Sequence, residues 1–372
     1  MVQTRQMKNL PLVALALIGL CFADAEEDCA APGVESKHEM ILVTGAVGQI
    51  GSELVVALRR EHGGDRVVAT GRKTAPGTEL RNGGPFHYVD VMNASQVNSL
   101  FTRYAFTQVY HMAAILSGVG ENRPQLAWKV NMDGLINVLE AVRKQEAQVE
   151  LESGDASARG SVRVMVPSSI AAFGPDAPSD APQDTAMHPT SMYGVTKVAG
   201  ELLADYYCQK YGLDVRGVRL PGIISAETLP GGGTTDYAVE IFYEAVKTGR
   251  YKCFLSPDTA LPMMYMPDCL HAMVSLMAAK RSQLKWPHAT MYNVNGFKLT
   301  PSQLESAIRE KLPGFKVDYE PDFRQAIADS WPDTMDDSVA REEWGWKPKF
   351  GVQQMTEDML ERLGKRHARG EL

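Results

Sequence analysis

The sequence has few cysteines and no pattern that would bind a metal. Its 372 residues include five cysteines, none of them in a C-x-x-C pair. The eight histidines are scattered, and no H-E-x-x-H motif occurs. These absences exclude a dense disulfide framework and the common zinc motifs. We therefore expect buried thiols in a reducing compartment and no metal site.

The chain also lacks an excess of positive charge and any strong compositional bias. Lys and Arg total 38 against 45 Asp and Glu, a net charge of −7, which argues against a nucleic-acid-binding protein. Apolar residues at 44% and charged residues at 22% are ordinary for globular proteins, so disorder is excluded as the main state. The length predicts two or three domains, or one large α/β domain with additions.

Residues 1–37 differ from the rest of the chain. An apolar run at 10–22 follows two basic residues and is too short to span a bilayer comfortably, so we expect no stable membrane insertion. The tripeptide Ala-Asp-Ala at 23–25 has the form of a signal-peptidase site. From these residues alone a secretory signal peptide, a mitochondrial presequence and a disordered extension or wrongly chosen start codon all stay open.

From residue 40 onward, short apolar runs alternate with segments of helical periodicity. We predict strands at 40–44, 66–70, 86–89, 108–112, 162–167 and 214–220. We predict helices at 49–60, 97–104, 128–145, 192–211, 301–311 and 356–369. Continuously apolar strands that alternate with helices are typical of an α/β fold with a doubly wound parallel Rossmann sheet.

A glycine-rich turn, TGAVGQIG at 44–51, joins the first predicted strand to the first predicted helix. Glycines permit a tight turn, a close approach of the backbone to a pyrophosphate and close packing of helix on strand. The helix N-terminus then faces the phosphate charge. We therefore predict that a dinucleotide is bound by Gly45, Val47, Gly48, Gln49, Ile50 and Gly51.

The end of the second predicted strand has no acid for the adenosine ribose diol. Thr70, Gly71, Arg72 and Lys73 stand where the dinucleotide fingerprint usually places Asp or Glu. The two basic residues could meet the 2′-phosphate of NADP. Alternatively, Arg72 stacks on adenine while a hydroxyl or backbone group takes the ribose. Asp90, after the third strand, is well placed for the adenine edge.

Tyr193 and Lys197 lie four residues apart in a predicted helix and therefore share one face. A phenol in water ionises only near pH 10, and a nearby ammonium favours the phenolate. The lysine can also hold the nicotinamide ribose. Ser169, 24 residues before the tyrosine at the end of the fifth strand, can hydrogen-bond a substrate oxygen beside the phenol. Serine, tyrosine and lysine after a dinucleotide loop form the triad of a short-chain dehydrogenase/reductase.

The glycine spacing and this triad resemble the extended short-chain dehydrogenase/reductase superfamily, which includes nucleotide-sugar epimerases. Longer segments are similar to the short-chain type of L-threonine 3-dehydrogenase, and they lie at 220–225, 230–238, 261–268, 330–332 with 336–338, and 344–346. The similarity covers about residues 39–362. It implies oxidation of the Cβ hydroxyl of L-threonine to 2-amino-3-ketobutyrate with NAD, by a homodimeric enzyme.

The resemblance also implies roles for single residues. Tyr193 would take the hydroxyl proton while hydride leaves for the nicotinamide, and Ser169 would position the substrate oxygen. The head group of the amino acid would be bound by Ser117, Gly233, Thr234 and Thr235, and Trp331 would close over the substrate unless it is core of the smaller lobe. Asn131 would support the lysine or be an ordinary polar residue of its helix. The implied cofactor contacts add Thr70, Arg72, Asp90, Val91, Ala113, Tyr193, Lys197 and Ile223.

Two other functions stay open. A nucleotide-sugar epimerase or dehydratase needs basic groups for a diphosphate, and the run at 230–238 contains no arginine. A dinucleotide-sensing protein without catalysis would typically lose the triad, which this chain keeps.

We predict three parts of the chain. Residues 1–37 form a targeting or signal-like segment, and residues 38–225 form the NAD-binding Rossmann domain, with a polar surface insertion at 146–160. Residues 226–372 mainly form a substrate-binding lobe, from which some segments return to the Rossmann domain. A threonine dehydrogenase needs oxidised NAD, which a secretory lumen would not be expected to supply. We therefore predict a mitochondrial protein with a transit peptide, and keep the secretory pathway as the alternative.

Overall fold

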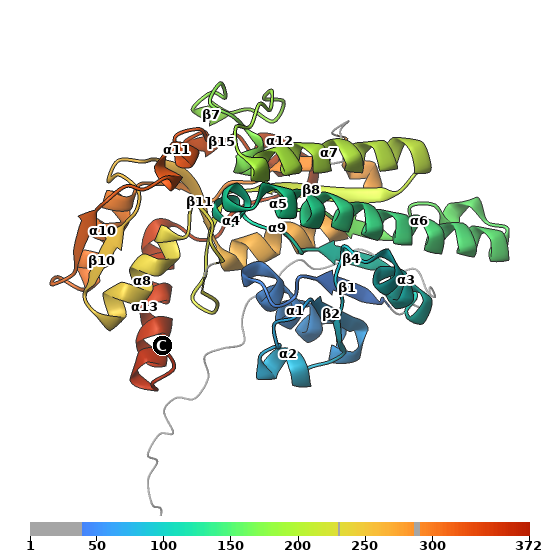
Figure 1. The fold of residues 1–372 in the computed structure, drawn as a ribbon, viewed down its shortest axis with the longest axis horizontal. Coiled ribbons are helices and arrows are strands. Elements are labelled where there is room, and N and C mark those ends of the chain that lie inside the picture. The colour runs from blue at the N-terminus through green and yellow to red at the C-terminus, as the bar shows by residue number, and fades with distance from the viewer. Residues whose placement is uncertain (1–38, 230, 286–290) are drawn as a thin grey trace, which may run out of the picture. The chain divides into compact units, whose positions relative to one another are not determined.

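The structure is a computed structural model, and it describes residues 39–229, 231–285 and 291–372. Its largest sheet has the strand order β12-β8-β5-β4-β1-β2-β3, with β6 also paired to β8 (Figure 1). All pairs within this sheet are parallel. The strand order reverses between β1 and β4, and ligands of doubly wound sheets bind at such a point. The prediction of a doubly wound α/β fold is confirmed.

The strands of the large sheet are short, and apart from the edge strand β3 they are fully or largely buried. They are β1 (Ile41–Thr44), β2 (Val67–Gly71), β3 (Phe86–Tyr88), β4 (Gln108–His111), β5 (Arg163–Met165), β6 (Ser168–Ser169), β8 (Asp214–Leu220) and β12 (Met291–Asn293). The helices associated with this sheet are α1 (Gln49–His62), α2 (Thr78–Asn82), α3 (Ala94–Arg103), α4 (Ser117–Asn122), α5 (Pro124–Trp128), α6 (Gly134–Ser153), α7 (Met192–Tyr211) and α9 (Met266–Ala278).

Helices cover both faces of this sheet, which explains why its strands read as continuous apolar runs. Alternate residues of β1 enter different cores. Ile41 and Val43 pack with α1 and α9, whereas Leu42 packs with α3, α6 and α7. All three side chains are fully buried. The strands are therefore apolar at successive positions because both faces of the sheet are buried.

Most of the remaining elements form a smaller lobe beside the sheet (Figure 1). Its strands are β7 (Asp180–Ala181), β9 (Gly222–Ile224), β10 (Arg250–Cys253), β11 (Leu261–Tyr265), β13 (Phe297–Leu299), β14 (Lys316–Tyr319) and β15 (Thr334–Met335). Its helices are α8 (Tyr237–Lys247), α10 (Pro301–Lys311), α11 (Arg324–Ala328) and α13 (Val352–Ala368). Helix α12 (Ser338–Trp344) instead packs against β12 and the core of the large sheet. Strand β12, which follows much of the lobe in sequence, pairs with β8 in the large sheet.

The structure differs from the sequence prediction around residues 146–160. Helix α6 continues to Ser153 instead of ending at Gln145. Glu146 is buried, and its carboxylate accepts hydrogen bonds from the backbone N–H groups of Gly160 at 3.0 Å and Val162 at 2.8 Å. The buried carboxylate thus connects the end of the polar segment to helix α6. Hydrophobic periodicity cannot predict this contact, because it is made by a charged side chain.

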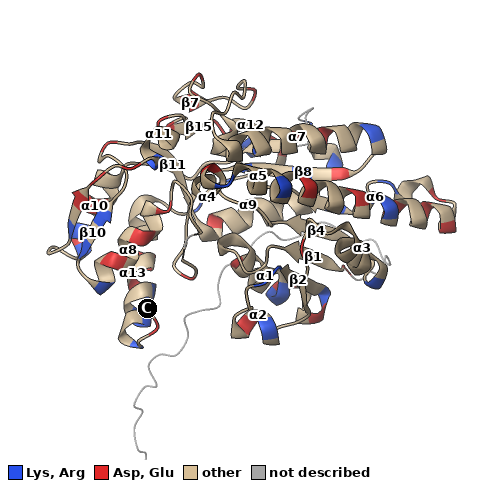
Figure 2. Cartoon of the chain, viewed as in Figure 1, with Lys and Arg blue, Asp and Glu red and all other residues tan. Residues whose placement is uncertain are grey.

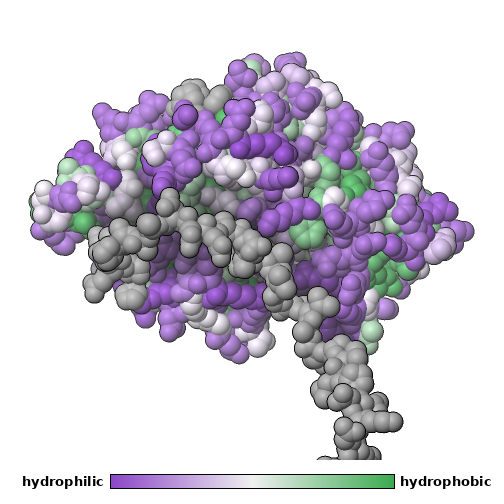
Figure 3. Space-filling model, turned by 180° about the vertical axis from the view of Figure 1, so that it is seen from behind, coloured by the Kyte–Doolittle hydropathy of each residue, from purple (hydrophilic) through white to green (hydrophobic). Residues whose placement is uncertain are grey.

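Charged residues of both signs are interspersed over the helices (Figure 2). The face seen from behind is largely hydrophilic, with separate hydrophobic areas (Figure 3). Among the described residues, no helix is both long and apolar enough to cross a membrane. In the same part of the chain, Cys208, Cys253 and Cys269 are free thiols.

Candidate active site

Two positions of the glycine turn at the end of β1 can hold only glycine. Gly45 has a φ of +63°, and a Cβ atom there would lie 2.7 Å from the Ala113 Cα. A Cβ atom on Gly51 would lie 2.3 Å from the Gly45 carbonyl oxygen. The missing side chains let β4, β1 and the start of α1 approach closely. The exposed backbone at the N-terminus of α1 fits the pyrophosphate of NAD.

A pocket of about 400 Å³ begins at this turn. Every residue predicted from the resemblance to bind the substrate lines it: Ser117, Ser169, Tyr193, Gly233, Thr234, Thr235 and Trp331. Most of the predicted cofactor residues also line it: Gly45, Val47, Gly48, Gln49, Ile50, Gly51, Ala113, Tyr193, Lys197 and Ile223. The fold thus brings segments that are far apart in the sequence to one cavity.

Four predicted cofactor residues do not line this pocket. Thr70 is buried, and its hydroxyl lies 3.5 Å from the Val43 carbonyl oxygen, so the side chain points into the sheet. Arg72 is exposed beyond the end of β2. Asp90 accepts a hydrogen bond from the Met92 N–H at 3.0 Å, and Val91 is buried. Their contacts with the adenosine end remain predictions.

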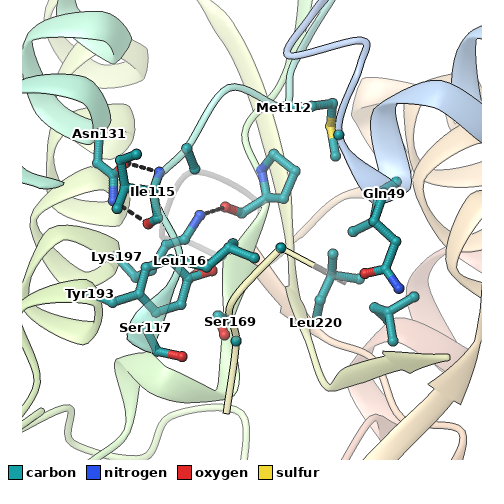
Figure 4. Close-up of a pocket in the computed structure, with 18 of the residues that line it drawn as sticks. Gln49, Met112, Ile115, Leu116, Ser117, Asn131, Ser169, Tyr193, Lys197 and Leu220 are labelled. Atoms are coloured by element: carbon teal, nitrogen blue, oxygen red, sulfur yellow. Dashed lines mark hydrogen bonds between the residues drawn. The ribbon is translucent and has the colours of Figure 1, made fainter. Parts of the chain in front are cut away.

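Tyr193, Lys197 and Ser169 lie together on one side of the pocket (Figure 4). The Lys197 Nζ lies 5.3 Å from the centroid of the Tyr193 ring and donates a hydrogen bond to the Pro167 carbonyl at 2.6 Å. The Ser169 Oγ accepts a hydrogen bond from the Ala171 N–H at 3.2 Å. The N–H uses only a lone pair of the Ser169 oxygen. The hydroxyl hydrogen of Ser169 therefore stays available for donation to a substrate oxygen.

Asn131 connects the loop after β4 to the helix that carries the tyrosine and lysine. Its Oδ1 accepts from the Ile115 N–H at 2.8 Å, and its Nδ2 donates to the Ile115 carbonyl at 3.1 Å (Figure 4). The same Nδ2 donates to the Thr196 Oγ1 at 2.9 Å. Asn131 lies in the π-helical turn Lys129–Asp133, between α5 and α6. Such turns are frequent at functional sites.

The other end of the pocket is lined by small hydroxyl-bearing side chains. The hydroxyl oxygens of Ser117 and Thr234 lie 3.0 Å apart, and the Thr234 N–H donates to the Ser117 Oγ at 3.1 Å. Both residues are buried. Trp331 lines this pocket and also belongs to the apolar core of the lobe, with only 8% of its surface exposed. The two roles considered for Trp331 are therefore both compatible with its position.

His111, at the end of β4, was not singled out from the sequence. Its Nδ1 lies 2.9 Å from the Thr44 Oγ1 in the neighbouring strand. Burial, together with the positive charge of Lys197, lowers the pKa of His111 to about 4, so the ring is neutral near pH 7. Lys197 is therefore the one positively charged side chain among the described residues that line the pocket.

A buried ion pair lies behind Ser169. Arg219 in β8 and Glu201 in α7 are both buried, and an Arg219 Nη2 to Glu201 Oε2 distance of 2.8 Å joins them. The Ser168 hydroxyl donates to the same carboxylate. Ser168 pairs with Arg219 between β6 and β8, so this cluster holds the strand end that presents Ser169. Sequence spacing could not reveal it, because its members come from three separate segments.

Known proteins similar to this chain agree with the fold and the pocket. A model of the NAD dependent epimerase/dehydratase family matches residues 41–294. An uncharacterised epimerase/dehydratase of Staphylococcus haemolyticus is 45% identical over 327 residues, which covers 87% of this chain and 98% of that protein.

Two solved structures are similar over nearly their whole length. A GalE-like L-threonine dehydrogenase from Cupriavidus necator, in its holo form, is 47% identical with a TM-score of 0.79, covering 87% of this chain and 99% of that one. An L-threonine dehydrogenase from Clostridium difficile is 42% identical with a TM-score of 0.81, covering 88% of this chain and 98% of that one. The resemblance stated from the motifs is confirmed, and NAD is the cofactor.

The prediction of a mitochondrial protein with a transit peptide is wrong. It rested on the need of a threonine dehydrogenase for oxidised NAD and on cysteines that lack the even, paired pattern of an oxidised protein. All three similar proteins come from bacteria, which have no mitochondria. Two of them are L-threonine dehydrogenases, so an enzyme of that kind does not require a mitochondrion. Residues 1–37 lie outside the described residues.

Proposed function

The chain belongs to the NAD dependent epimerase/dehydratase family and is an NAD-dependent oxidoreductase, and on this basis we propose that it oxidises L-threonine. The product of the proposed reaction is 2-amino-3-ketobutyrate. One observation carries the proposal. The triad Ser169, Tyr193 and Lys197 shares a pocket with the glycine turn at one end and the Ser117–Thr234 hydroxyl pair at the other.

In the proposed reaction the O–H and C–H bonds at the Cβ of threonine break and a carbonyl forms. NAD, held at the glycine turn, would supply the hydride acceptor. Tyr193, as phenolate, takes the hydroxyl proton, and the positive charge of Lys197 beside its ring stabilises that phenolate. Ser169 donates a hydrogen bond to the reacting oxygen, since its O–H stays available while its oxygen accepts from the Ala171 N–H. The Lys197 ammonium is held in place by the Pro167 carbonyl.

Several features of the pocket favour a small amino acid over a nucleotide sugar. Lys197 is the one Lys or Arg among the described lining residues, and it already serves the triad. A sugar diphosphate would require further cationic groups. The Ser117 and Thr234 hydroxyls instead offer neutral donors and acceptors, which suit a zwitterionic head group. Trp331 provides an apolar surface in the same pocket, which suits the threonine methyl group.

A substrate panel tests the proposal. The purified chain with NAD would be offered L-threonine, L-serine, L-allo-threonine and a UDP-hexose, and NADH absorbance would be followed. We expect the highest kcat/KM with L-threonine. Epimerisation of the UDP-hexose without activity on threonine would favour the epimerase function instead. NAD binding with no reaction on any of these substrates would favour the non-catalytic alternative.

We further propose that two copies of the chain associate through α7. Val195, Leu202 and Tyr206 are seven and four residues apart, so they share one face of that helix, and 39%, 65% and 51% of their surfaces are exposed. Such an apolar stripe on a surface helix favours pairing with an identical stripe across a two-fold axis. Light scattering after size-exclusion chromatography would show a dimer, and Leu202→Glu would shift it to monomer.

A further inference from the structure

The hydroxyl-bearing end of the pocket depends on the turn at 231–235, which precedes α8. This turn supplies Thr234, the partner of Ser117, and it lines the pocket at Gly231, Gly233, Thr234 and Thr235. Gly232 has a φ of +93°, a conformation that glycine adopts without strain. A turn so rich in glycine has high conformational entropy when free. Something must therefore hold it in the conformation seen here.

Asp236 supplies that restraint. A single carboxylate oxygen, Oδ2, accepts hydrogen bonds from the N–H groups of Gly232 at 2.8 Å and Gly233 at 2.6 Å. The residue lines the pocket and is buried, with 8% of its surface exposed. Its bonds run back to the residues that precede it, and it makes no side-chain cap of α8. The carboxylate therefore stabilises the turn rather than the helix.

We propose that Asp236 is a positioning residue of the substrate site, whose ionised carboxylate holds the 231–235 turn in the conformation that places Thr234 against Ser117. This inference rests on the proposed function, because it assigns that end of the pocket to the amino-acid head group. Hydrogen bonds to an ionised acceptor are stronger than those to a neutral one. The turn is therefore held most firmly when Asp236 carries its charge.

The surroundings of Asp236 place the ionisation of its carboxylate near pH 6, where the enzyme can be assayed. Burial raises the pKa of Asp236 to about 6, although the two N–H donors lower it. The carboxylate of Glu240, one turn further along α8, also raises the pKa, whereas the guanidinium of Arg324 at the start of α11 lowers it. The group is then ionised above about pH 6 and neutral below. Affinity for threonine should accordingly fall as the pH decreases through that value.

Three variants separate positioning from other roles. Asp236→Asn keeps a carbonyl oxygen for the two N–H donors and removes the charge, so it mimics the neutral acid. Asp236→Ala removes the acceptor altogether. Glu240→Gln leaves the turn untouched and removes the negative neighbour, which should lower the pKa of Asp236. Glu240 otherwise accepts from the Tyr251 hydroxyl at 2.9 Å, a bond that glutamine can keep.

The primary measurement is the dissociation constant of L-threonine from enzyme saturated with NADH, followed by NADH fluorescence between pH 5 and 8, because no turnover occurs in this complex. In the wild type we expect the constant to rise as the pH falls through about 6. In Asp236→Asn it should be independent of pH and close to the wild-type value at low pH. In Asp236→Ala it should rise about tenfold or more, the equivalent of losing one to two hydrogen bonds. Glu240→Gln should shift the wild-type midpoint to lower pH.

Steady-state kinetics supply the second readout. Asp236→Ala should raise the KM for threonine while the KM for NAD stays unchanged, since the glycine turn at 45–51 is separate from the 231–235 turn. A wild-type affinity for threonine in Asp236→Ala would overturn the proposal, and so would an unchanged pH profile in Asp236→Asn. If the wild-type chain does not oxidise threonine at all, the proposed function fails first, and that result is seen before any variant is made.

Discussion

The side-chain amide of Asn131 donates to the Thr196 Oγ1 at 2.9 Å, and Thr196 directly precedes Lys197 in α7. The same amide makes two hydrogen bonds with the backbone of Ile115 in the loop after β4. Asn131 thus links the helix that carries Tyr193 and Lys197 to the loop after β4, which lines the pocket. We therefore expect any support of the lysine by Asn131 to be indirect, because its amide bonds the neighbouring Thr196.

Asn131→Ala should lower kcat about tenfold, because it removes the hydrogen bonds that align α7 with the pocket. Gln145→Ala is a matched control. Gln145 lies in α6 and binds the backbone N–H and carbonyl of Phe106 in the same two-bond manner, away from the pocket. If both variants lost kcat equally, general loosening of the helices would be the cause. Initial rates at saturating threonine and NAD, with Tm values for both variants, decide this.

Tyr193→Phe should reduce the rate of threonine oxidation by about 10²–10⁴-fold, the usual value of general-base catalysis. The phenylalanine ring keeps the packing on α7, so NAD binding and Tm should stay near those of the wild type. Single-turnover rates and NADH titrations measure the two quantities separately. Near-normal turnover would show that another group takes the proton.

The chain should use NAD with a higher kcat/KM than NADP. Arg72 is exposed beyond β2, and one or two basic side chains provide only part of a site for a 2′-phosphate. Initial rates with the two cofactors, at saturating threonine, test the preference. Arg72→Ala should lower any residual activity with NADP and change the KM for NAD little. A preference for NADP would mean that Arg72 and Lys73 form a complete phosphate site.

Trp331→Ala should affect both stability and substrate binding. The side chain is almost fully buried in the lobe core, so its removal should cost about 3–5 kcal/mol of unfolding free energy. It also lines the substrate end of the pocket, so the KM for threonine should rise in the folded fraction. Trp331→Phe keeps an aromatic ring. It should therefore retain most of the unfolding free energy and a KM for threonine near that of the wild type. A lower Tm with an unchanged KM would restrict the tryptophan to the core.

Gly45→Ala should abolish NAD binding and destabilise the sheet. Its φ of +63° and the 2.7 Å approach of a new Cβ to the Ala113 backbone leave no room for a methyl group. Gly249→Ala is the control, because Gly249 has a similar φ of +70° but open space around its Cβ position. Calorimetric titration with NAD should show loss of binding in Gly45→Ala and normal binding in Gly249→Ala.

Local patterns in the sequence were sufficient for the elements with strong periodicity. Helices at 192–211 and 301–311 and the strand at 214–220 have the predicted bounds. The prediction ended α6 at Gln145 because its last turns are polar, and the buried carboxylate of Glu146 has partners that lie further along the chain.

The same limit applies to the site. The triad and the glycine turn are recognisable because each is a fixed spacing along the chain. The supporting contacts join separate segments, such as Thr44 with His111 and Ser117 with Thr234, which lie 67 and 117 positions apart. Sequence spacing has no signal for such pairs. Asp236, within a segment already noted for its similarity, becomes informative only when its two backbone donors are seen.

The return of β12 to the large sheet limits how this protein can be divided. The chain leaves the sheet after β8, builds β9 to β11 and α8, and then contributes α9 and β12 before the remaining lobe elements follow. A lobe taken from a relative could not be grafted at one junction, since a single cut after β8 would also remove a strand of the cofactor-binding sheet. A chimera would need several crossovers. New substrate specificities are more readily reached by replacing the short loops around Ser117 and Thr234 than by exchanging whole modules.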